Sequence, residues 1–388
     1  MKQRAAGALR AAAIPALAVV TGLMAGAVIV VVTDVEVIRA WSSFGSHPGG
    51  ALAATWRSVA RAYGALFEGS LGSAYAISES LVTTTPYILA GLAVALGFRA
   101  GLFNIGAEGQ LFMGALASVW VGYSVKGLSP WLHLPLALAA GAAAGAIWGA
   151  IPGYLKARTG AHEVVNTIMM NYIAFRLSDW LLNGPMKRPG PGGTPGYVPI
   201  SPEVLPSAYL PRLFEPPLRF HAGFFLALAV AVVVWWLLWR TPLGFEMRSV
   251  GANPQAARTA GMSVRKVYVV AMGMSGALAG LAGANQVLGV DRWVGQGFSP
   301  GYGFDSIALA LLGGSHPAGV VLASLLFGTL RSGATRMQSA AGIPIDIITI
   351  LQALILAFVA APALVRAIYR LKKAAPTAGP VLTRGWGK

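Results

Sequence analysis

The sequence predicts an all-α fold, a polytopic membrane bundle of about ten transmembrane helices. Of its 388 residues, 56% are hydrophobic and only 11% are charged, whereas soluble domains carry about 25% charged residues. The apolar residues are gathered in runs of about 20, which is the length that crosses a bilayer as a helix. Together these observations predict a single transmembrane domain over 1–388, without a separate soluble domain.

The composition also excludes several classes of site. The sequence contains no cysteine, which excludes disulfides, thiolate metal sites and cysteine nucleophiles. His162-Glu163 lacks the second histidine of a zinc protease motif, so we expect no metal site. The formal net charge is +16, and few aromatic residues lie between the basic ones. Anionic lipid headgroups account for this charge better than nucleic acid does.

The apolar segments come in a clear order along the chain. The first, 14–33, is longer than a signal-peptide core, and no convincing cleavage site precedes Asp34, so we expect a retained helix. Helices two to five are predicted over 80–183, and helices seven to ten over 267–368. The eighth segment, 303–314, is too short to cross regularly and predicts a broken or re-entrant helix.

Lysine and arginine are more frequent on one side of these segments. This bias places both termini and the insert 241–266 in the cytoplasm. The segments 34–79 and 184–219 then lie outside. The second of these is dense in proline and glycine, which predicts an extended, stiff chain. It is either a plain connection or a docking rim for an external partner.

The cytoplasmic insert carries the signals of a short helix. Asn253 can cap a helix, Pro254 suits its first position, and Gly261 suits a left-handed stop. The predicted helix, 254–260, is too short to be stable alone in water. The sequence also lacks a G-x-x-x-x-G-K-[ST] loop, so this chain cannot bind ATP by a P-loop. We interpret the helix as a part that another protein holds.

Glycines at intervals of four mark the fourth apolar segment. They lie along one ridge of a helix, where another backbone can approach closely. This pattern predicts tight helix packing rather than contact with a ligand. The glycines are Gly141, Gly145, Gly149 and Gly153.

Polar residues of the fifth segment share one helical face. Glu163, Asn166, Thr167, Met170 and Asn171 fall in one arc of about 140°. Amides and carboxylates are unfavourable against lipid, so this face should point into the bundle. It either makes hydrogen bonds between helices or lines a translocation path. Nearer the outer end, the arginine and aspartate at 176 and 179 predict a local ion pair.

The third and eighth segments begin with polar residues beside glycines, in FNIGAEGQ and GYGFDSIA. Their faint similarity suggests two related halves, with a path between them. These residues are either helix breaks or substrate contacts. With the fifth segment, the predicted path residues are Asn104, Glu108, Gln110, Asn166, Met170, Asn171 and Asp305.

Four ordered segments resemble the permease family of bacterial ABC importers for simple sugars and nucleosides. They are PYILAGLAVALGFRAGLFNIGAEGQLFMGA, EVVNTIMMNYIA, VGANPQAARTAGM and FDSIALALLGG. The resemblance covers roughly 80–370. EVVNTIMMNYIA and FNIGAEGQ are most similar to the nucleoside branch, which works with a basic-membrane-protein-type lipoprotein.

The resemblance implies a multi-pass permease of the bacterial plasma membrane that is not itself an enzyme and binds no cofactor. It would pair with a second permease, a heterodimer being favoured, and with two cytoplasmic ATPases that hold ATP and Mg. An external lipoprotein would deliver the nucleoside, which moves by alternating access. The coupling residues that would contact the ATPase are Gly251, Asn253, Pro254, Ala256, Ala257, Arg258 and Gly261.

Two alternatives remain open at this point. Within the same family, the substrate is a simple sugar. In a different class, the chain is an ion-coupled secondary transporter, with Glu108 or Asp305 as the group that binds a proton or sodium ion.

Overall fold

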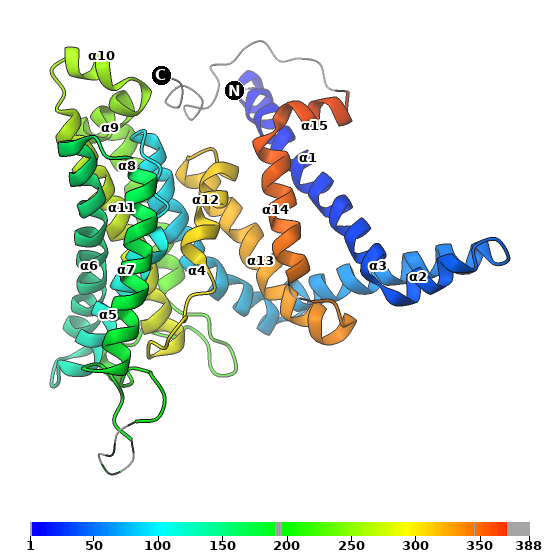
Figure 1. The fold of residues 1–388 in the computed structure, drawn as a ribbon, viewed down its shortest axis with the longest axis horizontal. Coiled ribbons are helices and arrows are strands. Elements are labelled where there is room, and N and C mark those ends of the chain that lie inside the picture. Colours follow the sequence, from blue (N-terminus) through cyan, green and yellow to red (C-terminus); the bar gives the residue numbers. More distant parts are fainter. Residues whose placement is uncertain (1, 191, 193, 195, 345, 371–388) are drawn as a thin grey trace. The chain divides into compact units, whose positions relative to one another are not determined.

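The computed structural model describes residues 2–370 except 191, 193, 195 and 345, and these residues are mostly helical (Figure 1). The helices of the N-terminal half are α1 (Lys2–Thr33), α2 (Val35–Ser42), α3 (Pro48–Leu71), α4 (Ala74–Arg99), α5 (Ala107–Ser124), α6 (Pro130–Thr159), α7 (Glu163–Asn183) and η2 (Pro206–Ala208). Those of the C-terminal half are α8 (Gly223–Arg240), α9 (Pro242–Ala252), α10 (Pro254–Thr259), α11 (Val264–Gln286), the π-helix η3 (Val287–Asp291), α12 (Tyr302–Leu312), α13 (Pro317–Ala341), α14 (Asp346–Ala360) and α15 (Pro362–Ile368).

The all-α prediction is confirmed for the described residues, where β pairing is limited to two isolated bridges. In the part of the chain that the structure describes, six helices are long and apolar enough to cross a membrane: α1, α4, α6, α8, α11 with η3, and α13. The predicted short eighth segment is also confirmed, because α12 has only 11 residues and ends before Gly314, which has a φ of +61°. The tail from 371, predicted to be cytoplasmic, lies outside the described residues.

The chain forms two compact units, with the division falling inside α4 and α13. Unit 1 comprises 2–83 and 326–370 of the described residues. Within it, α1 packs on α14, and a Cβ at Gly22 would lie 2.5 Å from the side chain of Ile355. The segment 34–79 is largely helical, and Asp34 caps α2 by accepting from the backbone N–H of Glu36 at 2.8 Å.

Unit 2, residues 84–325, is built around the contact between α6 and α11. The two backbones approach so closely that a Cβ at Gly145 would lie 2.2 Å from the carbonyl oxygen of Gly276. Gly141, Gly149 and Gly153 face the same helix α11. The predicted role of the glycine ridge in tight packing is therefore confirmed.

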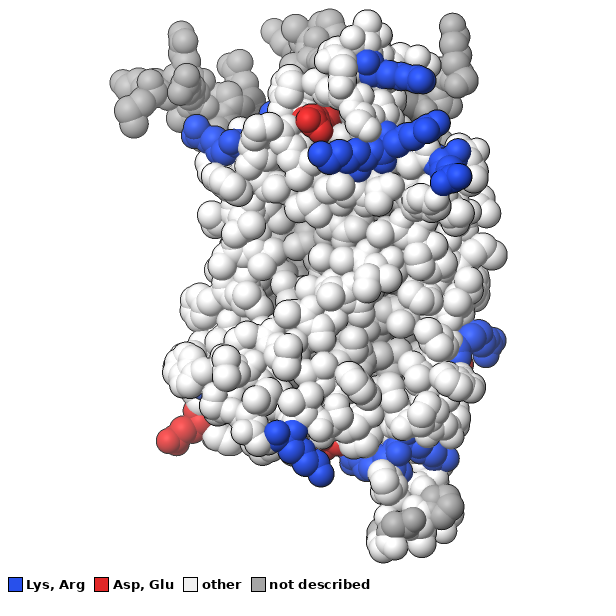
Figure 2. Space-filling view, turned by 90° about the vertical axis from the view of Figure 1, so that its left-hand side faces the viewer, with Lys and Arg blue, Asp and Glu red and all other residues white. Residues whose placement is uncertain are grey.

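The surface of unit 2 fits a membrane environment. Figure 2 shows one of its faces, where Lys and Arg gather toward the two ends and a wide band between them carries almost no charge. Large apolar side chains on α6 and α8 are exposed to the surroundings, among them Ile147 at 67% and Val232 at 63%. Such a band matches the hydrocarbon layer of a bilayer, where charged side chains are costly.

Candidate functional site

A cavity of about 500 Å³ opens on unit 2 between α5, α7, the start of α12 and the segment that precedes α12. It combines acidic, basic and aromatic side chains with two glycines of positive φ. Its lining residues are Glu108, Phe112, Tyr172, Phe175, Arg176, Asp179, Gly297, Ser299, Gly301 and Phe304.

Glu108 lies where two helices begin. It is in the first turn of α5, and its Oε2 accepts a hydrogen bond of 2.5 Å from the backbone N–H of Gly303 in the first turn of α12. The hydroxyl of Ser299 also donates to it. A Cβ at position 303 would lie 2.3 Å from the Glu108 nitrogen, so this approach requires glycine. The positive ends of two helix dipoles therefore surround a buried carboxylate.

Aromatic rings form the apolar side of the cavity. Phe112 packs against Phe175 at a centroid distance of 4.9 Å and against Phe298 at 4.7 Å. Tyr172 and Phe304, by contrast, are 60% and 45% exposed. Phe112, Phe175 and Phe298 thus form a packed wall, whereas Tyr172 and Phe304 offer open ring surface to a ligand.

Charged groups of α7 lie beside the aromatic rings. Arg176 approaches Asp179 at 3.6 Å, which confirms the predicted local ion pair. The other oxygen of Asp179 accepts a hydrogen bond of 3.0 Å from the side-chain amide of Gln296. The Arg176 side chain is 86% exposed, so its guanidinium is free to contact a further group.

The predicted path residues have different surroundings, and Glu108 is the one that lines the cavity. Asn104 donates to Gln110 at 2.9 Å and to Ser275 at 2.8 Å. Asn171 accepts from Gly109 N–H at 2.8 Å and donates to the Ile105 carbonyl at 2.9 Å. These three side chains thus bind the irregular segment before α5 to its neighbours.

The remaining path residues are dispersed. An oxygen of Asp305 accepts a hydrogen bond of 2.8 Å from the Tyr87 hydroxyl. The buried amide nitrogen of Asn166 has no partner among the described residues. Met170 is half-buried, and its carbonyl accepts from the Trp148 indole at 3.2 Å.

Sequence reasoning missed most of the cavity. A signal was present on α7, because Tyr172, Phe175, Arg176 and Asp179 follow the helical spacing of three and four residues. The exposed ring of Phe304 had no comparable signal. Its contribution depends on the contact between α12 and α5, two helices that are almost 200 residues apart in the chain.

The insert 241–266 forms the predicted short helix. Helix α10 runs from Pro254 to Thr259, and the Asn253 side chain accepts from the N–H groups of Gln255 and Ala256 at 3.0 and 3.1 Å. Gly261 has a φ of +84°, as a left-handed stop requires. The start and stop signals are therefore confirmed.

Most of the predicted coupling residues lie in α10 or at one of its two ends. Ala257 is buried, and its carbonyl accepts from Met262 N–H at 3.0 Å. Gly251 belongs to α9, where a Cβ would lie 2.2 Å from the carbonyl oxygen of Arg99 at the end of α4. A cavity of about 410 Å³ adjoins α10, lined by Ala157, Pro254, Gln255, Arg258, Met262, Ser263, Val264, Arg265 and Tyr268.

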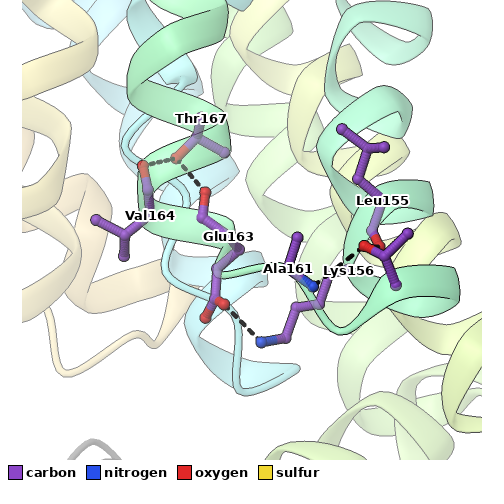
Figure 3. Close-up of polar contacts among 7 residues, drawn as sticks. Leu155, Lys156, Ala161, Glu163, Val164 and Thr167 are labelled. Carbon is purple, nitrogen blue, oxygen red and sulfur yellow. Dashed lines mark hydrogen bonds and ion pairs between the residues drawn. The ribbon is translucent and has the colours of Figure 1, made fainter.

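An ion pair joins the C-terminal end of α6 to the N-terminal end of α7 (Figure 3). Lys156 Nζ lies 2.5 Å from Glu163 Oε2, and both side chains are largely buried. The same ammonium lies 5.6 Å from the ring centroid of Tyr268, a residue that also lines the cavity beside α10. The connection between α6 and α7 is thus bound to α11 close to the insert.

Comparisons with known proteins identify the family of this chain. The family model described as branched-chain amino acid transport system / permease component matches residues 76–360. The guanosine ABC transporter permease protein NupP of Bacillus subtilis is 42% identical over 93% of this chain and 96% of its own length. The glucose ABC transporter permease protein TsgB13 of Haloferax volcanii is 40% identical over 76% of this chain and 79% of its own.

A third relative covers the chain almost as fully. The nucleoside ABC transporter permease protein NupB of Lactococcus lactis is 33% identical over 89% of this chain and 90% of its own length. No solved structure matches the chain. The family model and these relatives establish that the chain belongs to the family of ABC transporter permease components, as a multi-pass membrane protein.

Proposed function

We propose that this chain is the permease subunit of an ABC importer that carries nucleosides across the bacterial plasma membrane. The observation that carries the proposal is the 42% identity to a guanosine permease, which extends over nearly the whole length of both chains. A path for nucleosides also needs flat apolar surface and polar groups side by side. Unit 2 offers both at the cavity around Glu108.

Uptake by the complete transporter tests this function. The chain is expressed with its partner permease, ATPase subunits and lipoprotein in a host that lacks nucleoside uptake, and labelled guanosine, adenosine and glucose are compared. We expect nucleoside uptake that stops when the ATPase cannot hydrolyse ATP. Uptake of glucose alone would favour the sugar alternative, which the 40% identity to a glucose permease supports. Uptake that collapses with an uncoupler at constant ATP would favour the ion-coupled alternative.

We further infer that α10 is the contact with the ATPase. It has six residues, capped at both ends, and is therefore a preset shape that does not have to fold on binding. Arg258 lines the adjoining cavity and provides a positive charge for an acidic group of the partner. ATP and Mg are held by the ATPase subunits, and this chain binds no cofactor.

The arrangement of subunits and the membrane topology belong to the same proposal. We expect about ten segments in two related halves, with N- and C-termini and α10 in the cytoplasm. A heterodimer of permeases is supported by a second guanosine ABC transporter permease protein of Bacillus subtilis, NupQ, which is only 29% identical to this chain. An external lipoprotein delivers the substrate, and lipid headgroups surround the basic ends.

Replacement of Arg258 by alanine tests the coupling role. We expect uptake to be lost while the amount of assembled permease in the membrane stays unchanged. Normal uptake by the Arg258→Ala variant would refute the assignment of this arginine.

A further inference from the structure

We propose that the 500 Å³ cavity of unit 2 is a nucleoside-binding site, in which Tyr172 and Phe304 stack on the base and Glu108 accepts a hydrogen bond from a ribose hydroxyl. This inference rests on the proposed function and names the residues that would contact the substrate. The volume lies within the 300–1,000 Å³ or so that small-molecule sites occupy.

The aromatic rings divide into two sets with different tasks. Phe112 is 5% exposed and is held between Phe175 and Phe298, so it serves as a wall. Tyr172 on α7 and Phe304 on α12 lie on different helices and keep about half of their surface open. Every nucleobase has a flat π-face, and open aromatic rings recognise it without regard to its hydrogen-bonding edge.

Glu108 supplies the polar counterpart to these rings. The Gly303 N–H donates to its Oε2, and the Ser299 hydroxyl and the Phe304 N–H also donate to this carboxylate, which leaves about one of its four acceptor positions open. The remaining position suits one hydroxyl of a ribose, which is a hydrogen-bond donor. Because Glu108 is 2% exposed and braced by two helix starts, its carboxylate is already oriented before a ligand arrives.

The open side of the cavity also points to a polar path. Arg176 lies in the C-terminal half of α7 with its side chain 86% exposed, and a guanidinium facing hydrocarbon would be unfavourable. The open side of the cavity at Arg176 therefore suits a polar environment. A pure sugar could use Glu108 but would leave the open faces of Tyr172 and Phe304 without a base.

Binding of tritiated guanosine to the purified complete transporter in nanodiscs, measured by scintillation proximity, tests the site. We expect Tyr172→Leu and Phe304→Leu each to weaken guanosine binding about tenfold, the effect of one lost stacking contact. Trp180→Leu is the matched control, because Trp180 is an exposed ring of the same helix outside the cavity lining. That variant should bind guanosine as the unmodified protein does.

A second comparison tests Glu108. The unmodified protein should bind guanosine more tightly than 2′,3′-dideoxyguanosine, and Glu108→Gln should lose this discrimination while stacking is retained. Unchanged binding in both ring variants, or competition by glucose as strong as by guanosine, would overturn the site. These results are distinguishable from failure of the proposed function, in which the unmodified transporter takes up no nucleoside.

Discussion

Replacing Gly276 by alanine should separate α11 from α6. The added Cβ would lie 2.1 Å from the carbonyl oxygen of Gly145 and 3.0 Å from Cα of Gly149, and both atoms belong to backbone that cannot rotate away. Ordinary contact begins at 3.4 Å, so the helices must move apart by about 1.3 Å. Overpacking of this kind costs about 1–3 kcal/mol of folding free energy.

Gly273 provides a matched control on the same helix. A Cβ there would lie 3.7 Å from the carbonyl oxygen of Ala146, which is ordinary contact. Both substitutions gain the same helix propensity, about 1 kcal/mol at most, so the difference between them isolates the packing cost. Reversible unfolding in mixed micelles measures the free energy of unfolding of each variant. If Gly276→Ala is within about 0.5 kcal/mol of Gly273→Ala, the packing argument is wrong.

Three further predictions follow from caps, charges and burial. Asn253→Ala should destabilise the α10 region by about 1 kcal/mol and lower uptake. Asn253→Ser keeps a capping oxygen and should preserve both the stability of this region and the uptake. Normal uptake by the alanine variant would contradict the role of α10. A double-mutant cycle of Lys156→Met and Glu163→Gln should give a coupling free energy of about 1–3 kcal/mol in unfolding. The reason is that the distance between the two charged groups is short and both side chains are mostly shielded from water. A coupling free energy near zero would contradict this ion pair's role. Burial, aided by two nearby arginines, lowers the pKa of His221 to about 4. This residue precedes the α8 span and lies outside it. Because its pKa is lowered, the folded protein keeps His221 neutral in the range where the unfolded chain, with a histidine pKa of about 6.5, gains a proton. Stability should therefore fall as pH drops from about 6.5 to about 4, by at most about 3 kcal/mol, and His221→Gln should remove this part of the pH dependence.

Local signals predicted several elements correctly. The cap at Asn253 and the left-handed stop at Gly261 define α10, because helix ends depend on a few neighbouring residues. The glycine spacing around Gly145 predicted close packing, because a period of four residues places them on one ridge. Both patterns are complete within a short stretch of chain.

Other features depend on contacts between distant segments and had no such local pattern. The 11-residue helix α9 was not predicted, because its sequence, PLGFEMRSVGA, lacks a clear apolar period and contains two glycines. The cavity needs Glu108 beside Gly303, and their meeting depends on how α5 and α12 pack. The sequence alone also does not show whether a polar side chain contacts substrate or protein. In the structure, the side chains of Asn104, Gln110 and Asn171 form hydrogen bonds within the protein.

The central claim is that this chain forms the nucleoside path of an ATP-driven importer. The most direct measurement is guanosine accumulation in proteoliposomes that contain the complete transporter, with ATP supplied on the ATPase side and the lipoprotein on the other. We expect accumulation against a gradient that requires ATP and is lost with Arg258→Ala. Accumulation that proceeds without ATP, or that occurs for glucose and for no nucleoside, would contradict it.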